Sequence, residues 1–126
     1  MRQVVVTPET KFREVTDQLR ASVSGMKAIV LIGPDGEILD HLALDPSFDV
    51  ESFTSEYAML LRIAQRSFED TGAGDLTEHI AVSARSMTIA RSYASESYIV
   101  VIADSESQIG RARYELKRAA EHLSKR

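Results

Sequence analysis

Histidine is the side chain that most often acts as a general base, and this chain contains three, at His41, His79 and His122. No two of them have the H-E-x-x-H spacing of a zinc site. Glu78 and His79 are adjacent in a predicted strand, so their side chains point to opposite faces of it. These residues predict neither a metal centre nor an acid–base pair, and we interpret the three histidines as solvated.

The other reactive residue types also argue against catalysis. Cysteine is absent, which excludes thiolate chemistry, iron–sulfur clusters and cysteine-ligated zinc. None of the serines lies in a G-x-S-x-G turn. The stretch Gly33-Pro34-Asp35-Gly36 is predicted to be a tight turn between two strands, and it lacks the Lys-Ser/Thr pair of a phosphate-binding loop. We therefore expect a chain that is not an enzyme and that binds no cofactor or metal.

Size and charge narrow the function classes further. The chain has 126 residues, with 19 acidic and 15 basic side chains and a net charge of -4, so we expect one domain over residues 1–126. Because phosphate backbones attract clustered lysine and arginine, the negative charge predicts no nucleic-acid partner. No apolar stretch has the length of a signal-peptide core or a membrane span. We expect a cytoplasmic protein without membrane insertion.

Apolar spacing, caps and turn residues predict the element order α-β-β-α-β-β-β-α, an α+β fold. The helices are predicted between Thr7-Pro8-Glu9 and Gly25, from Asp49 or Ser52 to Asp70, and from the capping box Ser105-Glu106-Ser107-Gln108 to Leu123. The strands are predicted at residues 28–32, 37–44, 76–83, 87–93 and 98–103.

Two of these strands, 28–32 and 98–103, are unbroken apolar runs, which need cover on both faces. They are predicted to lie side by side at the centre of one five-stranded, mainly antiparallel sheet. Strand 37–44 is expected outside the first, and strands 87–93 and then 76–83 outside the other. The first and last helices are predicted on one face of the sheet and the middle helix on the other.

The last helix has a narrow apolar stripe, and its charged residues, Glu115 among them, are predicted to lie outside that stripe. We therefore expect this helix to contact the sheet alone. Gly110, near its start, costs about 1 kcal/mol relative to alanine in a helix interior. Close approach of the helix to the sheet is the predicted reason for this glycine.

The middle helix has more apolar surface than one contact with a sheet needs. Met59 and Ile63 widen its apolar arc to about 200°, and Glu56 projects within that arc. The surplus predicts a second contact, most simply a symmetric dimer in which this helix meets its copy. Cover by a long loop is the alternative. The main stripe consists of Phe53, Tyr57, Leu60, Leu61, Ala64 and Phe68.

Two stretches of the chain are more distinctive than the rest. One is the hairpin sequence AIVLIGPDGEIL over residues 28–39, and the other is IVVIAD over residues 99–104, followed by Ile109-Gly110-Arg111-Ala112, Glu115-Leu116 and Arg118-Ala119-Ala120-Glu121-His122-Leu123. Together with the element order over nearly the whole chain, they resemble the Roadblock family, of the dynein light-chain roadblock type, and especially its bacterial MglB-like regulators of Ras-like GTPases. The resemblance implies a roadblock/profilin-like fold.

The resemblance also implies a dimer and a partner. Members of this family pair through the middle helix and the third strand, and bacterial members bind small Ras-like GTPases over the paired helices. Some of them stimulate GTP hydrolysis without supplying a catalytic side chain. The residues that the resemblance places in the dimer interface are Phe53, Tyr57, Leu60, Leu61, Ala64, Phe68, His79 and Ala81. Those that it places on the partner-binding surface are Glu56, Met59, Arg62, Ile63 and Arg66.

Three hypotheses of function follow. The first is a homodimeric regulator of a small Ras-like GTPase, of the activating or the effector type. The second is a non-catalytic scaffold or adaptor subunit of a larger complex. The third is a small-ligand sensor, for which the sequence offers no convergent set of polar residues. Arg85 and Arg91 are interpreted as solvated rather than as an arginine finger acting on a partner's nucleotide.

Overall fold

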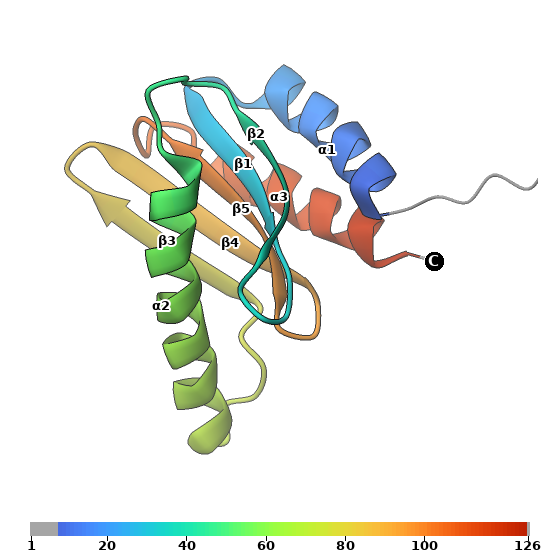
Figure 1. Ribbon diagram of the computed structural model, residues 1–126, viewed down its shortest axis with the longest axis vertical. Helices are drawn as coiled ribbons and strands as arrows, with labels where there is room; N and C mark the ends of the chain where they lie inside the picture. Colours follow the sequence, from blue (N-terminus) through green and yellow to red (C-terminus); the bar gives the residue numbers. More distant parts are fainter. Residues whose placement is uncertain (1–7, 126) are drawn as a thin grey trace, which may run out of the picture.

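The computed structural model describes residues 8–125, and its helices and strands follow the predicted order (Figure 1). The Thr7 helix cap lies outside the described residues. Among the described helices, none combines the length and the apolar character needed to cross a membrane. The elements are α1 (Pro8–Ser22), β1 (Met26–Ile32), β2 (Ile38–Ala43), α2 (Val50–Asp70), β3 (Glu78–Ser83), β4 (Ser86–Ala94), β5 (Ser97–Ala103) and α3 (Ile109–Ser124).

The five strands form one antiparallel sheet in the order β2-β1-β5-β4-β3. The predicted fold class and strand order are therefore confirmed. Helices α1 and α3 pack on one face of the sheet and α2 packs on the other (Figure 1). β5 is buried along its whole length and β1 almost so, because each has a helical layer on both sides.

The stretch from Gly33 to Gly36 is the tight turn that the sequence predicts. The Gly36 N–H donates to the Gly33 carbonyl at 3.0 Å, and Gly36 has a φ of +79°, which residues with a side chain rarely adopt. A Cβ atom at Gly36 would lie 3.4 Å from the Cβ of Ala58 on α2. The turn between β1 and β2 therefore contacts α2 directly.

The predicted capping box at the start of α3 is wrong. The N-cap of α3 is Gln108, whose side chain makes no cap hydrogen bond. Its amide binds the segment after α1 instead: Nε2 donates to the Ser24 hydroxyl at 2.9 Å, and Oε1 accepts from the Ser24 N–H at 3.0 Å. A contact between the start of α3 and the α1–β1 connection therefore takes the place of a cap formed by local residues.

Glu115 is buried, with 4% of its surface exposed, so the prediction that it lies outside the covered face of α3 is wrong. The reason is that α3 contacts α1 as well as the sheet. The guanidinium groups of Arg111 and Arg118 lie 4.0 Å and 3.8 Å from the Glu115 carboxylate. Its Oε2 atom has no hydrogen-bond partner among the described residues. Two charges therefore compensate this acid at a distance, without hydrogen bonds to that oxygen.

The predicted reason for Gly110 is also wrong. A Cβ atom built at Gly110 would have no described atom within 4 Å beyond its own helix turn and chain neighbours. The helix does not approach the sheet closely at this point.

Gly110→Ala should therefore raise the free energy of unfolding by about 0.5–1 kcal/mol, since alanine favours the helix and meets no obstacle. Urea denaturation of both proteins measures the difference. Gly36→Ala is the matched control and should destabilise the fold, because its φ of +79° is unfavourable for alanine. Loss of stability in Gly110→Ala would contradict the open space at that position.

Replacement of the buried acid gives a second test of the α1–α3 layer. Glu115→Met removes a desolvated charge and keeps the volume, so stability should be unchanged or rise by about 1 kcal/mol. The double variant Arg111→Ala, Arg118→Ala leaves the buried carboxylate without its cations. Its free energy of unfolding should fall by more than about 1 kcal/mol. The measurement is urea denaturation at neutral pH. A large loss of stability in Glu115→Met would mean that the carboxylate has a stabilising partner other than Arg111 and Arg118.

Candidate functional site

Helix α2 is the element that carries most of the predicted site residues, and its first turn is fixed by Asp49. The Asp49 carboxylate accepts from the Ser52 N–H at 3.1 Å and from the Ser52 hydroxyl at 2.8 Å. These two hydrogen bonds lower the pKa of the Asp49 carboxyl group. The N-cap therefore starts the helix at Val50, within the range that the sequence predicts.

A row of rings ties one flank of α2 to the edge strand β3. The ring centres of Phe48 and Phe53 are 5.5 Å apart, those of Phe53 and Tyr57 are 5.2 Å apart, and those of Tyr57 and His79 are 5.6 Å apart. The Tyr57 hydroxyl also lies 2.7 Å from His79 Nδ1. The row runs from the loop before α2, across the helix, to the α2-facing side of β3.

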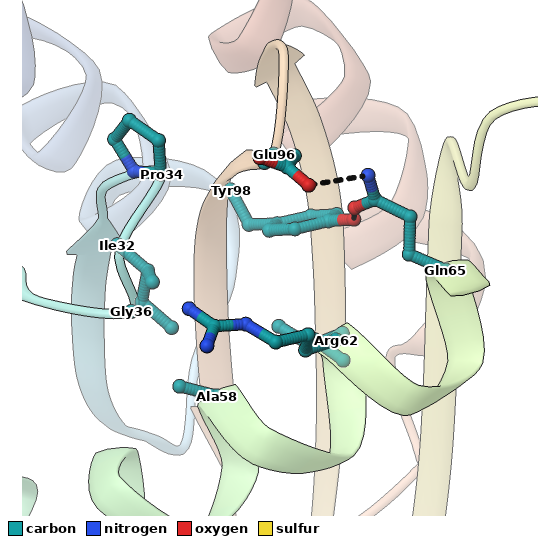
Figure 2. Close-up of a pocket in the computed structure, with 9 residues that line it drawn as sticks. Ile32, Pro34, Gly36, Ala58, Arg62, Gln65, Glu96 and Tyr98 are labelled. Carbon is teal, nitrogen blue, oxygen red and sulfur yellow. Dashed lines mark hydrogen bonds between the residues drawn. The ribbon is translucent and has the colours of Figure 1, made fainter.

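The opposite flank of α2 lies against the turns at one end of the sheet (Figure 2). The Tyr98 hydroxyl donates to Gln65 Oε1 at 2.5 Å, and Gln65 Nε2 donates to Glu96 at 3.4 Å. Burial, together with nearby carboxylates, raises the pKa of Tyr98 to about 12. Arg62 extends toward the turn at Gly36 (Figure 2). The cavity between these groups has about 20 Å³, room for one water molecule and not for a small ligand.

These two sets of contacts fix which residues of α2 face outward. Tyr57 and Leu61 are buried against the sheet, with 5% and 1% of their surfaces exposed. Three large side chains on the outer side are exposed, Met59 by 59%, Leu60 by 46% and Ile63 by 65%. We call Met59, Leu60 and Ile63 the outer apolar patch. The surplus apolar surface predicted for this helix is therefore real in the monomer, and no loop among the described residues covers it.

The helical period divides the predicted residues into a flank and a crest. At about 100° per residue, Phe53, Leu60 and Ala64 lie within about 40° of one another, on the same side as the ring row and facing β3. The crest is the solvent-facing side of the helix, and it is formed by exposed residues that all belong to the predicted partner-binding set: Glu56, Met59, Ile63 and Arg66. The last predicted partner residue, Arg62, is exposed on the side of the β1–β2 turn.

The remaining predicted interface residues lie at the two ends of this flank. His79 and Ala81 are half-buried on the α2-facing side of β3. β3 is the last strand of the sheet, so among the described residues one of its edges has no strand beside it. Phe68 is 45% exposed, and it belongs to the turns of α2 that extend past the sheet (Figure 1). The structure thus brings the outer apolar patch next to an open sheet edge.

The three histidines are in different environments, and the interpretation that all are solvated is wrong for the half-buried His79. His41 on β2 is exposed, whereas His79 is bonded to Tyr57 and His122 Nε2 lies 2.7 Å from the Glu14 carboxylate. The sequence contains no signal for these contacts, because each joins elements that are far apart along the chain.

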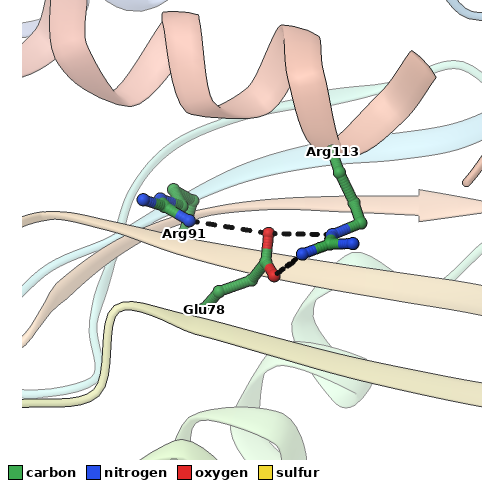
Figure 3. Close-up of polar contacts among 3 residues, drawn as sticks. All are labelled: Glu78, Arg91 and Arg113. Carbon is green, nitrogen blue, oxygen red and sulfur yellow. Dashed lines mark hydrogen bonds and ion pairs between the residues drawn. The ribbon is translucent and has the colours of Figure 1, made fainter. Parts of the chain in front are cut away.

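Glu78 and Arg91 lie on the other face of the sheet, as the strand alternation predicts. The Glu78 carboxylate accepts from Arg113 of α3 at 2.7 Å and lies 3.6 Å from Arg91 (Figure 3). Arg91 is thereby held under α3, on the face opposite α2, with 24% of its side chain exposed, so the interpretation that it is solvated is wrong. Arg85 lies in the turn between β3 and β4, where its carbonyl accepts from Lys27 at 3.3 Å.

Solved structures with the same architecture include two MglB proteins and a Roadblock/LC7 domain. Gliding protein MglB from Thermus thermophilus has 18% identity, with 96% of this chain and 91% of that chain covered and a TM-score of 0.82. MglB from Myxococcus xanthus has 21% identity, coverage of 91% and 93%, and a TM-score of 0.80. The Roadblock/LC7 domain from Streptomyces avermitilis has 17% identity, coverage of 87% and 92%, and a TM-score of 0.75.

The sequence itself matches no protein-family model and has no significant match among curated proteins. The likeness is therefore one of three-dimensional structure, and it extends over nearly the whole of this chain and of each solved one. The chain has the roadblock fold, the fold of MglB and of Roadblock/LC7 domains.

Proposed function

We propose that this chain is a dimeric regulatory protein that binds a small Ras-like GTPase and modulates its GTP hydrolysis. The single observation that carries the proposal is the outer apolar patch beside the open edge of β3, on a fold shared with MglB. An exposed apolar surface of this kind is typical of a protein–protein interface. An unpaired strand edge likewise needs a partner or a device that blocks aggregation.

The flank of α2 and the edge of β3 are the proposed dimer interface. Pairing of two β3 edges about a two-fold axis would satisfy their free backbone groups and bring the two α2 flanks together. Tyr57 and Leu61, both predicted interface residues, would then support the interface from the core, since they are already buried within one chain. The proposed contacts between copies are Phe53, Leu60, Ala64, Phe68, His79 and Ala81.

The crest of α2 is the proposed GTPase-binding surface. It presents Met59 and Ile63 between the charged residues Glu56, Arg62 and Arg66, the apolar centre and polar rim that interfaces commonly have. Such a surface can bind a partner protein without supplying a catalytic side chain to it. The regulator would therefore act by binding the hydrolysis-competent conformation of the GTPase more tightly than the other conformations.

Two substitutions on α2 separate the two surfaces. Leu60→Asp, on the flank, should weaken self-association at least about tenfold, because a carboxylate would be desolvated at the interface. Ile63→Asp, on the crest, should leave the dimer intact and weaken GTPase binding by a similar factor. Sedimentation equilibrium and titration calorimetry measure the two effects.

Tyr114→Asp is the matched control for both variants, since Tyr114 is a large exposed residue on α3, on the other face of the sheet. It should change neither self-association nor GTPase binding. All three variants should unfold within about 0.5 kcal/mol of one another, as surface substitutions usually do. Normal dimerisation and normal GTPase binding in both α2 variants would refute the assignment of these surfaces.

Capture from a lysate of the source organism identifies the partner, with the tagged chain as bait and GDP or a non-hydrolysable GTP analogue present. Retention of a small GTPase mainly with the analogue is the expected result, and the GTP hydrolysis rate of that purified GTPase with and without this chain then tests regulation. Capture of large assemblies independent of nucleotide, with no change in hydrolysis, would favour the alternative function of a scaffold or adaptor subunit.

A further inference from the structure

The contact between Tyr57 and His79 joins the two parts of the proposed dimer interface. Tyr57 lies on α2 and has 5% of its surface exposed, whereas His79 lies on β3 and is half-buried. The phenol oxygen and the imidazole Nδ1 are 2.7 Å apart, and the rings meet edge to face. Any change in this contact therefore changes how α2 sits on the edge strand.

The location of the protons in this contact follows from the available partners. A buried phenol has one hydrogen to donate, and His79 Nδ1 is the only acceptor for it among the described residues. Burial also raises the pKa of Tyr57, so the phenol keeps its hydrogen. His79 must then be neutral, with Nδ1 as the acceptor and the ring hydrogen on Nε2. Protonation of Nδ1 would reverse the bond and leave the phenol hydrogen without an acceptor.

The groups around His79 do not stabilise a positive charge. On β4 the register places Ala90 opposite His79, and its neighbours on that face are Thr88 and Ser92, all uncharged. On α2 the titratable group that faces the ring is Tyr57 itself. Glu78 and Arg91 lie on the other face of the sheet, where they bind each other. Burial therefore lowers the pKa of His79, with no compensating carboxylate.

We propose that His79 and Tyr57 form a proton-sensitive latch that couples self-association of this chain to pH. With His79 neutral, the latch holds the α2 flank against the β3 edge in the geometry that the dimer needs. With His79 protonated, the hydrogen bond is reversed, the phenol hydrogen loses its acceptor, and a charge is placed in the interface. This inference rests on the proposed dimer, because it requires that a second copy cover His79.

The sign of the effect follows from proton linkage. A second copy would bury His79 further, so its pKa should be lower in the dimer than in the monomer. The dimer is then favoured while His79 of the monomer is neutral, and this advantage is lost as the pH falls through the monomer's pKa, which burial already holds below the ordinary value of about 6.5. Each dimer buries two such rings, so its dissociation constant should rise at least about tenfold between pH 7.5 and pH 5.0.

The test is sedimentation equilibrium of the full chain over this pH range, with two variants and a control. His79→Gln keeps an acceptor for the phenol and cannot gain a proton, so its dissociation constant should not change with pH. Tyr57→Phe removes the hydrogen bond and keeps the ring, so the dimer should be weaker at pH 7.5 and less sensitive to pH. His41→Gln, which changes an exposed histidine on β2, should behave as the unmodified chain.

A proton NMR titration of the imidazole groups gives a readout that does not depend on the dimer. The pKa of His79 should lie below the ordinary histidine value of about 6.5, and it should rise in Tyr57→Phe. A chain that is monomeric at every pH but shows this titration would refute the proposed dimer and leave the latch within one chain. A pH-dependent dimer in His79→Gln, or a His79 pKa at or above the ordinary histidine value of about 6.5, would overturn the latch itself.

Discussion

The burial of the central strands on both faces is the constraint on which the rest of the structure depends. β1 and β5 have almost no polar side chains, so each face of the sheet needs a helical layer. Two helices, α1 and α3, share one face, and α2 alone covers the other. One helix cannot cover five strands, so the α2-facing side of β3 stays half-open. The candidate interface includes the part of this face that α2 does not cover.

The pattern of apolar residues in the sequence was sufficient to predict the strand order of the sheet and the helical layers on its two faces. The two unbroken apolar runs, 28–32 and 98–103, determined the centre, and a short turn joins each remaining strand to its inner neighbour in the sheet. Because such patterns extend over whole elements, a local exception does not alter them. The width of the apolar arc on α2 could also be predicted from the sequence. Met59 and Ile63 widen this arc whatever the position of the helix on the sheet.

The errors at Glu115, Gln108 and His79 concern contacts between elements that are distant in sequence. A helical wheel places Glu115 outside the face that α3 turns to the sheet. The wheel does not take α1 into account, and α1 covers Glu115 from the side. Gln108 fits a local capping box by residue type, yet its amide binds Ser24 in the α1–β1 connection. His79 has no signal at all, because its partner lies 22 residues away on α2. Local patterns determine elements, and tertiary neighbours determine the roles of single polar residues.

The rotation of α2 about its axis decides which residues form the outer surface, and apolar packing alone specifies that rotation weakly. Its apolar arc is wide, so a turn of the helix by one residue, about 100°, would still bury several large side chains. Hydrogen bonds are directional and remove this freedom. Tyr57 bonds to β3 on one flank, and Gln65 accepts from Tyr98 of β5 on the other. With both bonds formed, Leu61 faces the sheet while Met59 and Ile63 face outward, so two tyrosine hydroxyls determine the surface that α2 offers to a partner.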